Sequence, residues 1–149
     1  DLNYDKIGTY AFLNETTETD ILSGDTWQYV EGVFINDPIE NMYLNLSGSA
    51  PCLVYNYTTS HYMEITLFAS VSSDLPNTDI HISVDINDEV NGLATAETYA
   101  QNTGQIYNLG STAVKLMEQG DCITLVTKTD ASNKDLTFEH FTASIRRFF

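Results

Sequence analysis

The stretch YMEITLFASV at residues 62–71 decides the fold class, because its apolar side chains occupy every second position. These apolar residues are Met63, Ile65, Leu67, Ala69 and Val71. Successive side chains of a β-strand point to opposite faces, so the alternation predicts a strand with one buried face. Residues 72–77 then supply Ser, Asp, Pro and Asn, which favour a turn. The alternation resumes over residues 79–86 and predicts a second strand directly after the turn.

The remainder of the chain continues this series of short strands and turns. Asn91-Gly92 indicates a hairpin, and Leu93–Ala100 is the expected returning strand. Further strands are expected at residues 27–34, 42–46, 53–57, 122–128, 135–139 and 142–149. Residues 111–120 have helical propensity, but Val114 and Leu116 are spaced for one face of a strand, and we predict a strand there. Regularly spaced short strands predict an all-β sandwich or barrel.

The charge balance excludes several classes of partner. The 149 residues include 21 Asp and Glu against 6 Lys and Arg, which gives a net charge of −15. Nucleic acids and anionic bilayers are bound mainly through Lys and Arg, so we expect no nucleic-acid partner. No run approaches the roughly 18 apolar residues of a membrane-spanning helix, and we expect no membrane insertion. Hydrophobic residues make up 42% of the chain, which is enough for the core of one domain.

Some aromatic side chains fall on strand faces that the alternation predicts to be polar. Phe68 lies opposite the apolar set of its strand, and Phe148-Phe149 places aromatic rings on both faces of the last strand. A sheet that is apolar on both faces must have each face covered by other protein. In a chain of one domain, this pattern indicates an oligomer.

Residues that usually carry catalysis are sparse, and we expect that the protein is not an enzyme. The three histidines, His61, His81 and His140, lie in no recognisable motif, and the Gly-x-Ser-x-Gly nucleophile motif is absent. Residues 85–89 look like a calcium loop, but Val90 stands where an EF-hand needs Gly. This leaves a weak Ca²⁺ site or a solvated acidic loop, and no cofactor is expected.

Three Asn-x-Ser/Thr triplets begin at Asn14, Asn45 and Asn56. This pattern accepts an N-linked sugar only in a eukaryotic secretory route, and a chain rich in Asn and Thr also forms it by chance. The sequence alone does not choose between these two explanations.

Four segments resemble, in their order, the trimeric jelly rolls of the tumour necrosis factor and complement globular-head superfamily, particularly those of bacteriophage and viral structural proteins. They are residues 62–70, 79–87, 116–125 and 143–148, of which the Leu, short turn, Gly-Asp, strand unit at 116–125 is the most specific. The resemblance covers residues 26–149 and leaves residues 1–25 as an N-terminal arm or a first strand. It implies a ten-stranded, two-sheet jelly roll that packs as a homotrimer.

The resemblance also implies display and recognition rather than chemistry. Its viral versions point to a fibre, spike or capsid decoration head on the virion surface. Such a head would join other virion proteins through its N-terminal arm and bind a cell-surface receptor or glycan. The alternatives are a secreted, extracellular or spore-surface ligand of the same fold, and a carbohydrate-binding β-sandwich module.

In such a trimer we expect the first and last strands to line the threefold axis, through Phe141, Ile145, Phe148 and Phe149. Counting antiparallel strands back from the C-terminus puts Cys52 and Cys122 at the starts of strands that leave opposite ends of the sandwich. A strand of five residues spans about 17 Å, whereas bridged Cα atoms lie within roughly 7 Å of each other. We therefore predict two free thiols.

The same count gathers the loops 57–61, 87–92 and 118–121 and a turn near His140 at one end of the sandwich. It places the C-terminus and the N-terminal arm at the other end, which makes the first end a free apex. Rigid scaffolds present functional loops outward. The predicted binding residues are therefore Tyr57, His61, Asp88, Glu89, Glu118, Asp121 and His140. Acidic side chains from three copies would repel polyanions there or hold a cation such as Ca²⁺ on the axis.

Overall fold

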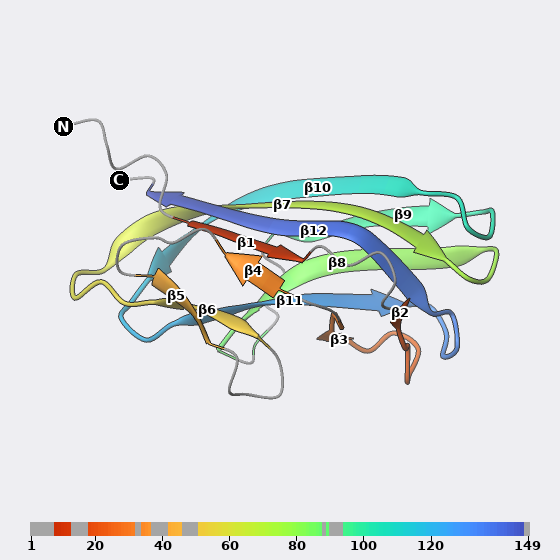
Figure 1. The fold of residues 1–149 in the computed structure, drawn as a ribbon, viewed down its shortest axis with the longest axis horizontal. Helices are drawn as coiled ribbons and strands as arrows, with labels where there is room; N and C mark the ends of the chain where they lie inside the picture. Colours follow the sequence, from red (N-terminus) through yellow and green to blue (C-terminus); the bar gives the residue numbers. More distant parts are fainter. Residues whose placement is uncertain are drawn as a thin grey trace.

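The computed structural model describes residues 8–12, 18–31, 34–36, 42–45, 51–87, 89 and 94–147. In these residues every regular element is a β-strand, and the strands form two antiparallel sheets packed face to face (Figure 1). The predicted all-β, two-sheet fold is confirmed. Within the described ranges no helix is long and apolar enough to span a bilayer.

Over the described ranges, each sheet consists of a path of five strands and one added strand of two residues. The first sheet runs in the order β10 (Tyr107–Met117), β7 (His61–Ser73), β12 (Leu136–Arg147), β1 (Gly8–Phe12) and β4 (Phe34–Asn36), with β2 (Glu18–Thr19) beside β12. The second runs in the order β5 (Met42–Asn45), β6 (Cys52–Tyr55), β11 (Cys122–Thr129), β8 (Thr78–Ile86) and β9 (Ala96–Ala100), with β3 (Gln28–Tyr29) beside β11. The two paths together contain the ten strands of a jelly roll.

The core lies between the sheets and follows the alternation of β7. Met63, Ile65 and Leu67 are at most 1% exposed, and they share one core cluster with Ile80 and Ile82 of β8 in the opposite sheet. Burying a side chain of this size contributes roughly 1.5–3 kcal/mol. The period-2 pattern therefore fixes which face of the first sheet turns inward.

Residues 111–120, where helical propensity competes with strand spacing, lie mostly in β10. Every residue of β10 pairs with β7, from Tyr107 opposite Val71 to Met117 opposite His61. This ladder places Met117 and Leu109 in the core and turns Val114 and Leu116 outward. The tertiary pairing overrides the local propensity, and the prediction of a strand is confirmed.

The last strand, β12, is continuous, so the predicted turn near His140 is wrong. Its register with β7 shifts between Phe138 and His140, where a β-bulge absorbs one residue. Phe138 and Phe141 can therefore both face the core, where their rings stack with centroids 5.0 Å apart. One strand thus replaces the two that were expected at residues 135–139 and 142–149.

The loops gather at two ends of the sandwich. The near end contains residues 56–60, Asn87 and the turn 118–121, and the Gly120 amide donates to the Tyr55 carbonyl there at 2.7 Å. The far end contains residues 20–26, 74–77, 101–105 and 130–135, whose loops are also joined by backbone hydrogen bonds.

Both the start of β1 and the end of β12 lie at the near end (Figure 1). Gly8 pairs with Ile145, and Arg147 pairs with Met63 close to the start of β7. The prediction that the C-terminus lies at the end opposite residues 57–61 is therefore wrong. The cause is the bulge, because counting β12 as two strands reversed the direction of the last one.

Cys52 and Cys122 form a disulfide with Cα atoms 5.6 Å apart, so the prediction of free thiols is wrong. Strands β6 and β11 are antiparallel, but they pair only through Cys122 with Val54 and Ile123 with Leu53. Strand β6 is only four residues long, and its Leu53 and Val54 lie opposite the first two residues of β11, so no strand length separates Cys52 from Cys122. The two cysteines lie diagonally across the pair on one face.

The disulfide gives the first testable prediction. Unreduced protein in denaturant should titrate no thiols, and reduced protein should titrate two. The bridge joins positions 70 residues apart, and removing it with Cys52→Ser/Cys122→Ser should lower the free energy of unfolding by about 2–4 kcal/mol. Chemical denaturation measures this loss, and reduction of the wild type should reproduce it. Two thiols in unreduced protein would contradict the pairing.

Candidate interaction surface and loop clusters

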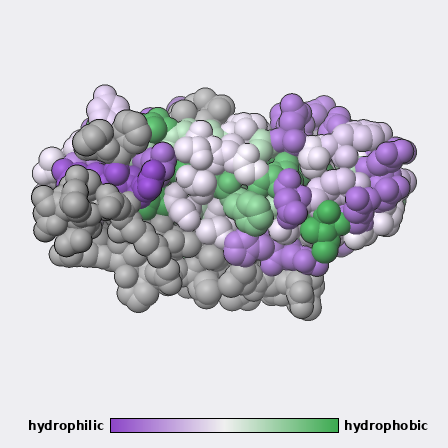
Figure 2. Space-filling view, turned by 90° about the horizontal axis from the view of Figure 1, so that it is seen from above, coloured by the Kyte–Doolittle hydropathy of each residue, from purple (hydrophilic) through white to green (hydrophobic). Residues whose placement is uncertain are grey.

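The outward side of the first sheet carries a group of exposed apolar side chains. We call the outward-facing positions of β7, β10 and β12 the open face. Four large residues on it are partly exposed: Tyr62 (52%), Phe68 (46%), Val114 (39%) and Leu116 (42%). Figure 2 looks onto this side of the molecule, where pale and hydrophobic residues gather over the middle and hydrophilic residues lie toward the ends.

The strand register brings these residues together. Leu116 lies directly opposite Tyr62, and Phe68 lies opposite Gly110. A side chain at Gly110 would begin 3.3 Å from the Leu67 carbonyl oxygen and 4.0 Å from the Phe68 ring. The absence of a side chain at position 110 therefore leaves one side of the Phe68 ring free.

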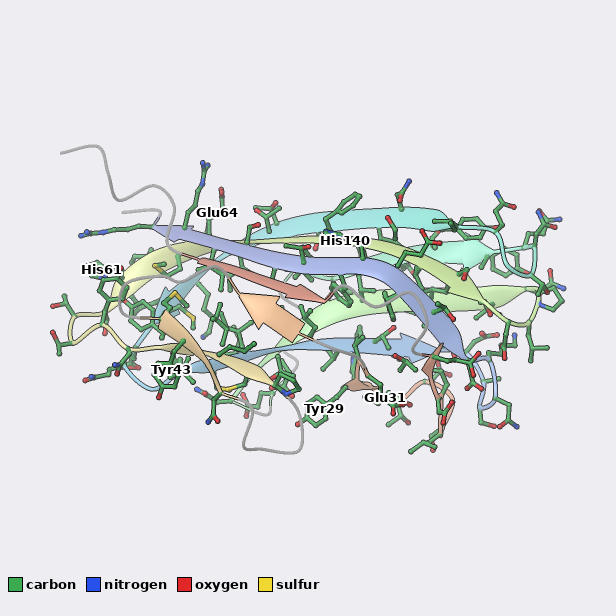
Figure 3. The ribbon with its side chains drawn as sticks, viewed as in Figure 1. Tyr29, Glu31, Tyr43, His61, Glu64 and His140 are labelled. Atoms are coloured by element: carbon green, nitrogen blue, oxygen red, sulfur yellow. A yellow bond between two sulfur atoms is a disulfide. The ribbon has the colours of Figure 1, made fainter. Side chains whose placement is uncertain are left out.

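The polar groups of the open face are largely paired with one another. Arg146 Nε donates to Glu64 Oε1 at 2.6 Å, and Ser70 Oγ donates to Asn108 Oδ1 at 2.7 Å. His140 is hydrogen-bonded to Thr142, and its ring lies 5.8 Å from that of Phe68. In Figure 3, Glu64 and His140 both point away from the sandwich on this side. Because a buried polar group is costly only when it is unpaired, a partner could cover this face at modest cost.

Two of the residues predicted to line a trimer axis, Phe141 and Ile145, are not on this face. Phe141 and Ile145 are at most 1% exposed and belong to the core between the sheets, so that assignment is wrong. The bulge in β12 sets their direction, because it changes which residues of that strand face inward. Phe148 and Phe149 lie outside the described residues.

The sequence predicted one residue of the open face. The sequence singled out Phe68 as an aromatic residue on a predicted polar face, and the structure exposes it there. Tyr62, Val114 and Leu116 were missed, although the same alternation places each of them opposite the core residues of its own strand. His140 lies on the open face and not in a loop.

Tyr57 and His61 come together at the near end around Tyr55. The buried Tyr55 hydroxyl donates to the Thr59 carbonyl at 2.8 Å and lies 2.6 Å from His61 Nδ1. The Tyr57 ring packs against both, with centroids 5.2 Å from Tyr55 and 5.8 Å from His61. Burial lowers the pKa of His61, and the positive charge of Arg147 lowers it further. Figure 3 shows His61 at this end.

The acidic near-end residues divide between a structural role and an exposed one. The Asp121 carboxylate accepts hydrogen bonds from Asn87 Nδ2 at 2.8 Å and from the Glu118 amide at 2.9 Å. It therefore fixes the turn between β10 and β11. The exposed Glu89 and Glu118 line a cleft of about 350 Å³ together with Lys115. Asp88 lies outside the described residues.

Thus the structure brings Glu89, Glu118 and Asp121 together beside the Tyr57–His61 pair, and it separates His140 from them. The prediction that these loops bind a partner stays a prediction. Its argument from a free apex does not hold, because the start of β1 and the end of β12 lie at this same end.

A second acidic group lies at the far end, which the sequence did not single out. Single carboxylate oxygens of Glu18, Asp20 and Asp135 lie within 4.8 Å of one another, close enough for one cation to contact all three. The Ile21 amide donates to Asp135 at 2.7 Å. Partial burial raises the pKa of Glu18, and repulsion from Asp74, Asp135 and Asp20 adds to this. Burial and Asp135 likewise raise the pKa of Asp74.

Comparison with known proteins supports the fold. No protein-family model and no curated protein matches the sequence. Among solved structures, Eiger TNF from S. frugiperda matches with a TM-score of 0.64 and 13% identity, over 97% of this chain and 94% of that one. Murine APRIL matches with a TM-score of 0.57 and 12% identity, over 93% of this chain and 98% of that one. The chain therefore has a TNF-like jelly-roll fold.

The far-end acids give a prediction on pH dependence. A carboxyl group with a raised pKa holds its proton more tightly in the folded state than in the unfolded chain. The stability that this group contributes is therefore lost as the pH rises from its pKa in the unfolded chain through its raised pKa in the folded protein. The ordinary values are 4.5 for Glu18 and 3.8 for Asp74. Glu18→Gln should therefore be more stable than the wild type at pH 7, and this advantage should shrink as pH falls toward 4.

Urea denaturation of the two proteins between pH 4 and 7 measures this difference. Glu118→Gln at the near end is the matched control, because it removes one negative charge without changing the far-end group. An equal stabilisation by both variants would show that total charge, and not the local cluster, is responsible.

Proposed function

We propose that this chain is a non-catalytic recognition module that assembles into a homotrimer through its open face and binds a partner outside the cell. The observation that carries the proposal is the open face, where Tyr62, Phe68, Val114 and Leu116 are exposed on a sheet whose other side already packs the core. Apolar surface that gathers in this way gains free energy when it leaves water.

The charges on the open face favour a second copy as its occupant. The outward positions of residues 62–68, 110–116 and 140–146 include one carboxylate, Glu64, and one guanidinium, Arg146, and these two are paired. The whole chain has a net charge of −15, so two copies repel each other wherever their carboxylates meet. The open face is a surface on which that repulsion is small.

Three copies follow from the resemblance to trimeric jelly rolls. A closed threefold arrangement also covers the apolar surface in every copy and leaves no open face to recruit more chains. The contacting residues in this proposal are those of the open face, in place of Phe141 and Ile145.

The disulfide supports a location outside the reducing cytoplasm, because such bridges persist on secreted proteins and on virion or cell surfaces. We propose the virion surface, where the chain acts as the head of a fibre, spike or decoration protein and contacts other virion proteins. A secreted TNF-like ligand is the alternative setting, and it uses the same trimer.

In either setting, the loops at the two ends of the sandwich meet the partner, a cell-surface protein or glycan. The near end offers Tyr57, Glu89 and Glu118. The far end adds exposed apolar side chains at Leu75 and Ile106. A trimer built on the open face leaves both sets of loops accessible.

Sedimentation of wild type and variants tests the assembly. The wild type should sediment with three times the chain mass, and Phe68→Asp should raise the trimer dissociation constant about 30-fold or more, as expected for a central interface residue. Leu116→Asp should have the same effect. Tyr99→Asp is the matched control, because Tyr99 is a comparably exposed aromatic residue on β9 of the other sheet, and it should leave the mass unchanged.

Thermal unfolding of each variant checks that the monomer is still folded. A monomeric wild type would contradict the proposed assembly, and a monomer that binds polysaccharides would support the carbohydrate-binding module instead. A trimer weakened by Tyr99→Asp and not by Phe68→Asp would assign the interface to the second sheet.

A further inference from the structure

The loop between β6 and β7 contains the triplet Asn56-Tyr57-Thr58, which has the form of an N-glycosylation acceptor. Of the three such triplets in the chain, this is the one whose residues are all described. The triplet at Asn14 lies outside the described residues, as do Leu46 and Ser47 of the triplet at Asn45. The structure therefore shows how the triplet at Asn56 is presented to solvent.

The loop turns the two residues that matter for modification toward solvent. Asn56 and Thr58 are exposed, whereas Tyr57 packs inward against Tyr55 and His61. The hydrogen bond from the buried Tyr55 hydroxyl to the Thr59 carbonyl fixes the loop on its inner side. The Asn56 side chain accepts a hydrogen bond at 3.3 Å from Gln119, which is itself exposed, through its oxygen and not its nitrogen.

The disulfide supplies an independent reason to place this chain where such sugars are attached. Cys52, only four residues before Asn56, is bridged to Cys122. Disulfides form in the lumen of the endoplasmic reticulum, which is also where N-linked sugars are added to secreted chains. A chain that acquires the bridge during secretion meets the glycosylation machinery in the same compartment.

We propose that Asn56 is an N-glycosylation site, modified by transfer of an oligosaccharide from a polyprenyl pyrophosphate donor. The Asn56 side-chain nitrogen forms a bond to C1 of the first sugar, and the bond between C1 and the pyrophosphate oxygen breaks. The lipid pyrophosphate leaves with the bonding electrons, and the proton lost by the nitrogen balances the negative charge that the pyrophosphate gains. The Thr58 hydroxyl completes the acceptor triplet.

This site has a consequence for display. A glycan on Asn56 projects from the near end beside Gln119 and the turn 118–121, and it lies away from Phe68 at the middle of the open face. It therefore leaves Phe68, the centre of the proposed trimer contact, uncovered. The inference does not depend on the trimer, because it follows from the loop and the disulfide.

Secretion from cultured insect cells behind an appended signal peptide tests the proposal. The wild type should lose mass on treatment with peptide-N-glycosidase, and peptide mapping should show conversion of Asn56 to Asp. Asn56→Gln and Thr58→Ala should both abolish modification at this position, and Thr58→Ser should retain it. Asn45→Gln is the matched control and should leave the glycan on Asn56 in place.

An unmodified Asn56 peptide from secreted, disulfide-bonded wild type would overturn the proposal. A glycan that persists on the same peptide in Thr58→Ala would also overturn it, because the attachment would then not use this triplet. Sedimentation of the glycosylated protein separates this result from the assembly proposal, since either can fail without the other.

Discussion

Strand β7 packs apolar side chains on both of its faces and pairs along its length with a neighbour on each side. Its inward residues, such as Ile65 and Leu67, fill the core, and its outward residues, Tyr62 and Phe68, are left partly exposed. Strands β10 and β12 pair with it almost from end to end. The first sheet is therefore built around a strand that one sandwich cannot fully bury.

The rest of the molecule fits this constraint. The second sheet covers the inner side of β7 with the aliphatic residues of β8, and the disulfide ties the starts of β6 and β11 within that sheet. The polar groups next to Phe68 and Tyr62 are paired within the open face, as in the Glu64–Arg146 ion pair. Carboxylates instead crowd at the two ends, where loops meet solvent. Charge is thus concentrated away from the surface that is proposed to meet another copy.

The sequence was informative wherever burial imposed a period of two. The alternation at residues 62–71 and 79–86 predicted β7 and β8, and it flagged Phe68 as an outlier. It failed where one residue breaks the period. The bulge at residues 138–140 makes β12 look like two strands, and this error reversed the C-terminal end. The same bulge turns Phe141 and Ile145 toward the core, whereas the resemblance implied that they line a trimer axis.

Two other features depended on contacts that no local pattern reveals. The disulfide was missed because β6 overlaps β11 by only two residue pairs, and strand direction alone does not predict such an overlap. Asp135 lies more than a hundred residues after Glu18 and Asp20 in the chain, and β2 brings them together by pairing with β12. Their proximity is therefore a property of the topology and not of the sequence near any one of them.

The central claim is that the open face is buried against other copies, and photo-crosslinking from its middle tests it most directly. Phe68 replaced by p-benzoyl-phenylalanine preserves an aromatic side chain at this position and forms a covalent bond to whatever touches it on irradiation. The account predicts crosslinked dimers and trimers, with the attachment points on β7, β10 or β12 of another copy. Irradiated protein that remains a single chain at concentrations well above those used for sedimentation would contradict it.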